Sequence, residues 1–325
     1  MTRIRPTAPC ALLCAATLLI APAAYAAESY PSRTVRVIVP STPGGSVDTL
    51  GRLVSQKLSA ATGQQFVVEN RSGSGGVVGT EIVAKAAPDG HTLLMAYHSH
   101  VINPALYKKL PFDTIRDFAP ITQVAVQPLL FNVHPSLPAN GPRELINLAK
   151  ARPGEILYGS AGAGSGGHLA TEMFAYMGGA KLTHVPYKGA SPALIDVISG
   201  NTQLMVATVI ASMGHIKSGR LKGIGVTSAK RASVLPNVPA IAEAIPGFEA
   251  LVSYFFLAPA GTPNEIIQQL SAESIKALKA PDTVERLAAA SAEPVANTPA
   301  ETAKVIQSEM VKWGKIVQVS GASAN

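Results

Sequence analysis

Cysteine is nearly absent from this 325-residue sequence, which contains only Cys10 and Cys14. Both lie in an apolar segment close to the N-terminus, so the chain after it cannot form disulfides, use a thiolate nucleophile or bind zinc through sulfur. Charged residues are also sparse, at 14% of the sequence, and the net charge of +7 is scattered along the chain. A nucleic-acid-binding surface gathers its basic residues into a patch or stripe, so we expect no nucleic acid partner.

Motifs of common hydrolases and nucleotide-binding enzymes are missing as well. The sequence contains no G-x-S-x-G, no H-E-x-x-H and no G-x-x-x-x-G-K-[ST]. Residues 162–167 fit G-x-G-x-x-G, but the acidic residue that the dinucleotide motif needs about 20 positions later is missing. His98 and His100 could pair on a metal, although a turn at the end of a strand is the simpler interpretation. We therefore expect a binding protein rather than an enzyme, with no cofactor and no metal.

The N-terminus has the features of a secretory signal peptide. Arg3 and Arg5 precede an apolar run over residues 8–21, and Ala24-Tyr25-Ala26 is a small-x-small cleavage site. The run is short for a bilayer span. We expect residues 1–26 to be removed, which places the mature protein in the periplasm.

The rest of the chain alternates between short apolar strands and amphipathic helices. Strands are expected over residues 35–39, 66–69 and 92–96, and a helix over 47–60, where Leu50, Leu53, Val54 and Leu58 recur at helical spacing. The alternation restarts after Pro128 and ends with two amphipathic helices, over residues 264–279 and 299–319. This order predicts an α/β protein with mainly parallel sheets flanked by helices.

Three glycine-rich loops stand between a strand and a helix, at residues 43–45, 73–76 and 162–167. Ligands of open α/β sheets bind beyond the carboxyl ends of the strands. There, the first turn of a helix offers free N–H groups and partial positive charge, while glycine lets the backbone approach an anion. One such loop is as well explained as a plain turn, but three at one edge of a sheet predict an anion-binding cleft. Asp48, His168 and His184 are interpreted as structural.

Several segments together resemble one family, the periplasmic receptors of tripartite tricarboxylate transporters, also called Bug-type solute-binding proteins. Each segment is weak alone, but their order and spacing are specific and cover nearly the whole chain after the signal. The matching segments are residues 39–48, 73–86, 88–94, 102–107, 158–169, 184–189, 258–263 and 313–315.

The resemblance implies a two-lobed periplasmic-binding-protein-like fold of type II. Lobe 1 is expected over residues 27–127 plus 249–325 and lobe 2 over 128–248, with hinge crossings near 121–131 and 248–257. Relatives hold a ligand carboxylate through backbone amides and hydroxyls of loops from both lobes. Carried over by motif, the substrate-binding residues are Thr42, Gly44, Gly45, Ser160, Ala163, Gly164, Ser165 and Thr208. Ser41 departs from the family, which usually has an aromatic residue there, so the ligand does not follow by analogy.

The resemblance also implies a function, namely capture of a small organic acid for the membrane subunits of a tripartite tricarboxylate-type transporter. An alternative is a receptor of the same fold that docks on a membrane sensor kinase. An anion-dependent or nucleotide-dependent enzyme is the third hypothesis. The receptor is expected to be a monomer.

The first prediction concerns export. N-terminal sequencing of the protein from the periplasmic fraction is expected to begin at Ala27, because cleavage follows Ala26. Retention in the membrane fraction with residues 1–26 intact contradicts it.

Overall fold

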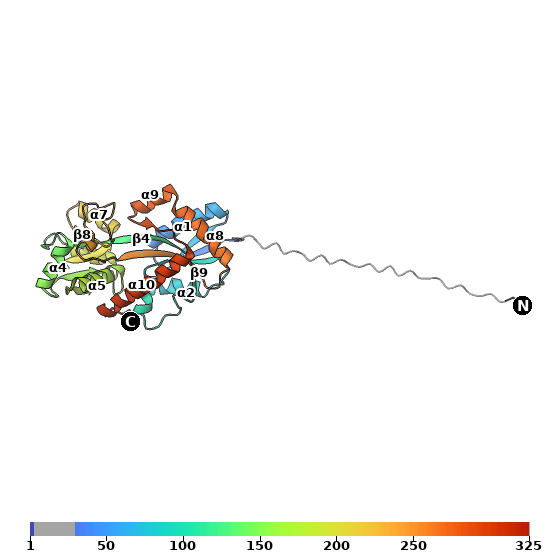
Figure 1. Ribbon diagram of the computed structural model, residues 1–325, viewed down its shortest axis with the longest axis horizontal. Helices are drawn as coiled ribbons and strands as arrows, with labels where there is room; N and C mark the ends of the chain where they lie inside the picture. The colour runs from blue at the N-terminus through green and yellow to red at the C-terminus, as the bar shows by residue number, and fades with distance from the viewer. Residues whose placement is uncertain (3–29, 325) are drawn as a thin grey trace.

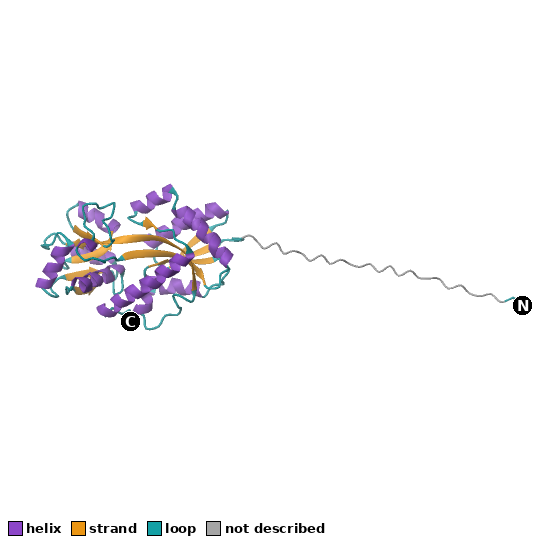
Figure 2. Cartoon of the chain, viewed as in Figure 1, coloured by secondary structure: helices purple, strands orange, loops and turns teal. Residues whose placement is uncertain are grey.

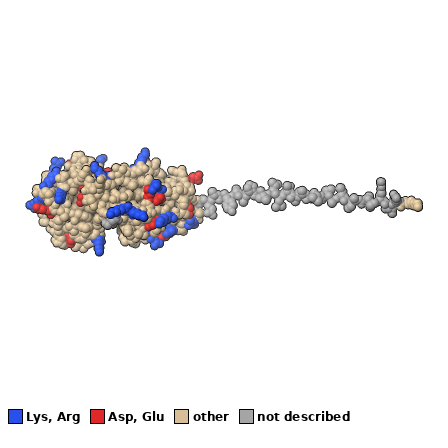
Figure 3. Space-filling model, turned by 90° about the horizontal axis from the view of Figure 1, so that it is seen from below, with Lys and Arg blue, Asp and Glu red and all other residues tan. Residues whose placement is uncertain are grey.

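The computed structural model describes residues 1–2 and 30–324, so the expected signal peptide lies almost wholly outside the described residues. The described chain forms two lobes that lie side by side (Figure 1). Helices cover both faces of the strands, which run through both lobes (Figure 2). The expected two-lobed α/β fold is confirmed. On the face drawn in Figure 3, basic and acidic residues are interspersed.

The first lobe has three parallel strands, in the order β2-β1-β3, followed by the antiparallel strands β9 and β4. Its core strands are short, apolar and rich in β-branched residues, as a buried parallel sheet requires. The strands are β1 (Val35–Val39), β2 (Phe66–Asn70), β3 (Thr92–Tyr97), β4 (Phe118–Val133), β9 (Leu251–Pro259) and β10 (Glu293–Pro294). The helices are α1 (Ser46–Thr62), α2 (Val77–Ala84), α3 (Ser99–Leu106), α8 (Asn264–Leu278) and α9 (Pro281–Ala289), with a short 3₁₀ turn at Ser74–Gly76.

The second lobe repeats the scheme with the order β7-β5-β6 in parallel, and both β7 and β8 pair antiparallel with β4. Its strands are β5 (Leu157–Ser160), β6 (Thr183–Pro186), β7 (Leu204–Thr208) and β8 (Lys222–Val226). Its helices are α4 (Pro142–Ala151), α5 (Gly166–Gly178), α6 (Ala190–Ile198) and α7 (Val209–Lys217), with a 3₁₀ turn at Ile241–Glu243. Both sheets are therefore mixed, because the strands that pass between lobes run against the parallel ones.

Strand β4 belongs to both lobes. It pairs with β9 as far as Pro128 and with β7 and β8 from Leu129 onward. The Leu129 amide donates to the Thr227 hydroxyl at 2.7 Å, and the Ala250 amide donates to the Thr227 carbonyl at 2.9 Å. Both passages of the chain are thus tied to buried Thr227. The change of partner falls within the span where a crossing is expected, while the lobe boundaries themselves stay a prediction.

Helix α10 (Pro299–Ser320) forms a third link between the lobes. Its start is held by a capping box, in which Thr298 and Glu301 each accept the other's amide N–H. The helix packs on α3 in the first lobe and on α5 in the second (Figure 1). Near its end, the Lys315 ammonium lies 5.5 Å from the centre of the Tyr176 ring on α5.

Several local expectations are confirmed. Helix α1 covers the expected residues 47–60, and it is capped by Gly63, which adopts the left-handed conformation at φ 75°. Helices α8 and α10 lie within a residue or two of their expected ranges. Helices α3, α7 and α9 were not expected from the sequence. Within the described part of the chain, none of the helices combines the length and the hydrophobicity needed to cross a bilayer.

His100 in α3 generates a prediction about acid stability. It is 2% exposed, its ring packs edge-on against Phe118 with centroids 4.9 Å apart, and neither ring nitrogen has a hydrogen-bond partner. Burial lowers the pKa of His100 from 6.5 to about 4. Between pH 6.5 and about pH 4, His100 is therefore protonated in the unfolded chain but neutral in the folded chain. Stability is unaffected by this group above pH 6.5 and falls by about 1.4 kcal/mol per pH unit between the two values.

The variant His100→Phe keeps the ring shape and removes the titrating group. The free energy of unfolding, measured with urea between pH 7 and pH 4.5, is expected to fall less steeply with decreasing pH in the variant than in the wild type. The difference in slope corresponds to the uptake of about one proton on unfolding. Parallel stability curves for the two proteins contradict the prediction.

Candidate functional site

A cavity of about 290 Å³ lies between the lobes at the carboxyl ends of β3 and β7, and we call it the cleft cavity. Residues of both lobes line it, which makes it a place where one small molecule touches both. Its wall consists of Ser46, Val47, Tyr97, His98, Leu129, Ala161, Ser165, Gly166, Gly167, Ala190, Met205, Val206, Ala207, Thr208, Ala211, Val252 and Tyr254.

Five helices begin at the cleft cavity, and one of them is α6, whose first residue is Ala190. Ser46 starts α1, His98 directly precedes α3, Ser165 is the N-cap of α5, and Thr208 is the N-cap of α7. The first N–H groups of a helix have no partner within it, and the helix dipole adds partial positive charge at the same end. Two of these ends come from the first lobe and three from the second. The cavity is thus surrounded by neutral donors that favour an anion.

The wall of the cleft cavity carries no Asp, Glu, Lys or Arg. Its titratable side chains are neutral near pH 7, because burial lowers the pKa of His98 to about 4 and raises the pKa of Tyr254 to about 12. Burial also raises the pKa of Tyr97. An anion in this cavity meets no competing carboxylate and no fixed countercharge.

Tyr254 and Gln127 form the polar floor where β9 and β4 cross between lobes. The Tyr254 hydroxyl donates to Gln127 Oε1 at 2.8 Å, and Gln127 Nε2 donates to the Ala290 carbonyl at 2.7 Å. Both side chains are almost fully buried. This chain of hydrogen bonds fixes the Tyr254 ring at the cavity wall.

The loop before α1 is held by Asp48. Its carboxylate, 5% exposed, accepts the Gly44 amide at 2.9 Å, the Asn70 amide group at 2.9 Å and the Arg52 guanidinium. Burial opposes ionisation, but the hydrogen bonds from Gly44, Arg52 and Asn70 leave the pKa of Asp48 below its usual value. Asp48 thus has a structural role. The Gly44 amide, which was expected to bind the ligand, donates to Asp48 instead.

Ser160 lies beneath the glycine loop that precedes α5. It is fully buried, its hydroxyl is 2.6 Å from His184 Nε2, and it exchanges hydrogen bonds with the carbonyl and amide of Gly162 at 3.1 Å each. Ser160 therefore contacts the loop and His184, and its side chain does not line the cleft cavity.

His168 holds the same loop from the other side. Its Nδ1 accepts the Gly164 amide at 3.0 Å, so a neutral ring carries its proton on Nε2. The ring stacks on His184 with centroids 3.9 Å apart. Burial, reinforced by His184, lowers the pKa of His168 to about 3. The histidine pair thus fixes the shape of the loop in its uncharged form.

Ser165 is placed at the cleft cavity as a helix cap. Its hydroxyl oxygen accepts the His168 amide at 3.3 Å, which leaves its hydroxyl hydrogen free to donate. Behind it, Gly167 lies so close to β7 that an added Cβ atom would stand 2.1 Å from the Val206 carbonyl oxygen. Across the cleft, a Cβ on Gly166 would stand 2.9 Å from His98 Nε2. Glycine at both positions lets the start of α5 reach the site.

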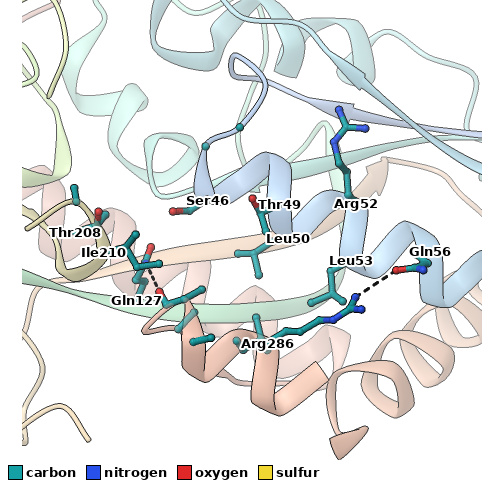
Figure 4. A pocket seen from close by; sticks show the side chains of 17 residues that line it. Ser46, Thr49, Leu50, Arg52, Leu53, Gln56, Gln127, Thr208, Ile210 and Arg286 are labelled. Carbon is teal, nitrogen blue, oxygen red and sulfur yellow. Dashed lines mark hydrogen bonds between the residues drawn. The ribbon is translucent and has the colours of Figure 1, made fainter. Parts of the chain in front are cut away.

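A larger cavity of about 790 Å³ adjoins the cleft cavity, and we call it the α1 groove. Ser46, Thr208 and Ala211 line both. The groove runs along α1, with α9 and the first turn of α7 opposite (Figure 4). A third cavity, of about 360 Å³, lies on the α3 side of His98 and includes Ala163, Gly164 and Ser165.

The residues expected to bind the ligand are thus divided among the three cavities, and two of them line none. Thr208 lines the cleft cavity and the α1 groove, and Ser165 lines the cleft cavity and the α3-side cavity. Gly44 and Gly45 lie on the α1 groove, and Ala163 and Gly164 on the α3-side cavity. Thr42 is exposed and, like Ser160, lines none of the three.

Sequence reasoning missed several residues that line these cavities, above all Tyr97 and His98 of the cleft cavity and Gln127 of the α1 groove. Gln127 had no local signal, because it reaches the cavity only through the pairing of β4 with β9. His98 was considered as a metal ligand, but no group of three His, Cys, Asp or Glu residues that could hold a metal occurs within residues 30–324.

A cleft between two α/β lobes, lined by glycine loops at helix starts, is the architecture of solute-binding receptors. The family model described as tripartite tricarboxylate transporter family receptor matches residues 50–322. This chain belongs to that receptor family. The resemblance inferred from sequence is confirmed, and so is the class, a binding protein rather than an enzyme.

Relatives of this family align along nearly the whole chain. BugT of Bordetella pertussis is 37% identical over 303 residues, which are 92% of this chain and 93% of BugT. A protein of R. palustris solved with adipate is 36% identical, with a TM-score of 0.80 over 90% of this chain and 99% of that one. MatC from Rhodopseudomonas palustris, solved with bound malate, is 30% identical, with a TM-score of 0.75 over 89% of this chain and 100% of MatC.

The approach of Gly167 to β7 generates a stability prediction. Gly167→Ala is expected to destabilise the protein by about 1–3 kcal/mol, because the methyl group meets a backbone carbonyl that cannot move without shifting β7. The matched control is Gly214→Ala in α7, where an added Cβ meets no atom within 4 Å. That change is expected to be neutral or to stabilise by about 0.5–1 kcal/mol. Chemical denaturation of both variants tests this, and equal effects contradict it.

Proposed function

We propose that this protein captures a small organic acid in the cleft cavity and delivers it to the membrane subunits of a tripartite tricarboxylate-type transporter in the periplasm. The observation that carries the proposal is the cavity wall, which combines five helix starts and several hydroxyls with no charged side chain. Neutral donors of this kind bind a carboxylate strongly and still release it, since no countercharge must be separated.

The donors proposed to touch the carboxylate are the Ser165 hydroxyl and the amides at the start of α5, with Thr208 and Ser46 on the opposite wall. Gly44, Gly45, Ala163 and Gly164 shape the adjoining loops. Thr42 and Ser160 require a rearrangement to reach a ligand, because one is exposed outside the cavities and the other is buried beneath its loop. No observation favours docking on a sensor kinase over delivery to a transporter.

Recognition of charge gives the test of this proposal. In titration calorimetry, adipate or malate is expected to bind the wild type, whereas the corresponding diamide binds at least tenfold more weakly. A charge-assisted hydrogen bond contributes about 1.5–3 kcal/mol, so Ser165→Ala is expected to weaken acid binding by roughly 10- to 100-fold.

The matched control for Ser165→Ala is Thr298→Ala, which removes the N-cap of α10. Both variants lose a helix cap, worth about 1 kcal/mol of stability, but only Ser165 faces the cleft cavity. Thr298→Ala is expected to bind the acid as the wild type does. Equal binding of acid and diamide, or unchanged binding by Ser165→Ala, contradicts the proposed site.

A further inference from the structure

The α1 groove has the form of a compartment for the body of a ligand. One face of α1 forms its length, and the residues on that face are Ser46, Thr49, Leu50, Leu53 and Gln56. Leu50, Leu53 and Leu287 supply a buried apolar wall, and exposed Ile210 of the second lobe faces them across the groove. Water in such a groove is displaced favourably by methylene groups.

Polar side chains lie at the two ends of the groove. Ser46 and Thr208 stand at the end shared with the cleft cavity, and Gln56 and Arg286 stand at the other (Figure 4). Ten residues of α1 separate Ser46 from Gln56, a distance of about 15 Å along the helix axis. A short acid held at the start of α1 does not reach the far end.

Arg286 is a cation without a direct ion pair. It acts electrostatically on Asp282, one turn earlier on α9, but the Asp282 carboxylate is bonded to Lys57. Among residues 30–324 it has no carboxylate within ion-pair distance, and its side chain makes a long hydrogen bond, 3.5 Å from Nη1 to Gln56 Oε1. The other arginine at the groove, Arg52, is bound to Asp48 and Asn70 and points away from Arg286 (Figure 4). The adjacent ion pair between Lys57 and Asp282, at 2.6 Å, ties α9 to α1 and so fixes the backbone that carries Arg286.

We propose that the ligand is an elongated dicarboxylate whose first carboxylate binds in the cleft cavity, whose methylene chain lies in the α1 groove and whose second carboxylate pairs with Arg286. This inference rests on the proposed function and specifies its ligand. Arginine holds a carboxylate through two parallel N–H···O bonds, which makes the far end selective for a planar anion. Each buried methylene group strengthens binding by about fourfold.

Titration calorimetry with succinate, adipate, suberate and sebacate tests the length. Affinity is expected to rise from succinate to suberate by at least tenfold. Octanoate, which has the length of suberate and lacks its second carboxylate, separates the contribution of the chain from that of Arg286.

Arg286→Gln tests the far end. It is expected to weaken suberate binding by roughly 10- to 100-fold and to leave octanoate and succinate within about twofold. Arg116→Gln, which removes one exposed positive charge outside the groove, is the matched control and is expected to change none of these affinities. Thr49→Phe fills the groove, so it is expected to weaken suberate and spare succinate.

The outcomes separate this inference from the proposed function. If succinate binds wild type as tightly as suberate, or Arg286→Gln binds suberate normally, the elongated ligand is wrong while capture of an acid stands. If none of the four acids binds the wild type, both are wrong.

Discussion

The backbone pairing of β4 with β9 holds the two lobes in one frame. Strand β4 pairs in both lobes, and β9 begins where the chain returns from the second lobe. Both passages are tied to Thr227, through Leu129 in β4 and through Ala250 just before β9. The helix starts that surround the cleft cavity follow strands of these two sheets, so their convergence depends on how the crossing strands orient the sheets. Gln127 and Tyr254 lie on the crossing strands themselves, so their hydrogen bond anchors the cavity wall on the strands that pass between the lobes.

The proposed anion site contains no countercharge, in keeping with the low charge content of the loops around the cleft cavity. The carboxylate of Asp48 and the rings of His168 and His184 stand one layer behind the cavity, where they hold the loop amides in place. The histidines do this as neutral groups, because burial keeps the pKa of each below its usual value. The charged and histidine side chains that hold the loops are therefore not the side chains that line the cleft cavity.

Much of this architecture could be predicted from local sequence signals. The glycine loops, the helix expected over residues 47–60 and the two C-terminal helices each depend on neighbouring residues. Strand β4 could be recognised only in its second half, since Pro120 and Pro128 interrupt the pattern expected of a strand. Both prolines are tolerated because the pairing with β9 is irregular near the first and changes partner after the second. Tyr97, His98 and Gln127 join the site through contacts between distant segments, which no local pattern contains.

Helix α10 gives the cleft a closed side and an open side. Because it packs on α3 and on α5, it connects the two lobes along one edge of the cleft. Any separation of the lobes is then greatest at the opposite edge, where α7 faces α9 across the α1 groove. Under the proposed function, solute entry falls between α7 and α9, and the surface offered to the transporter lies at that same edge.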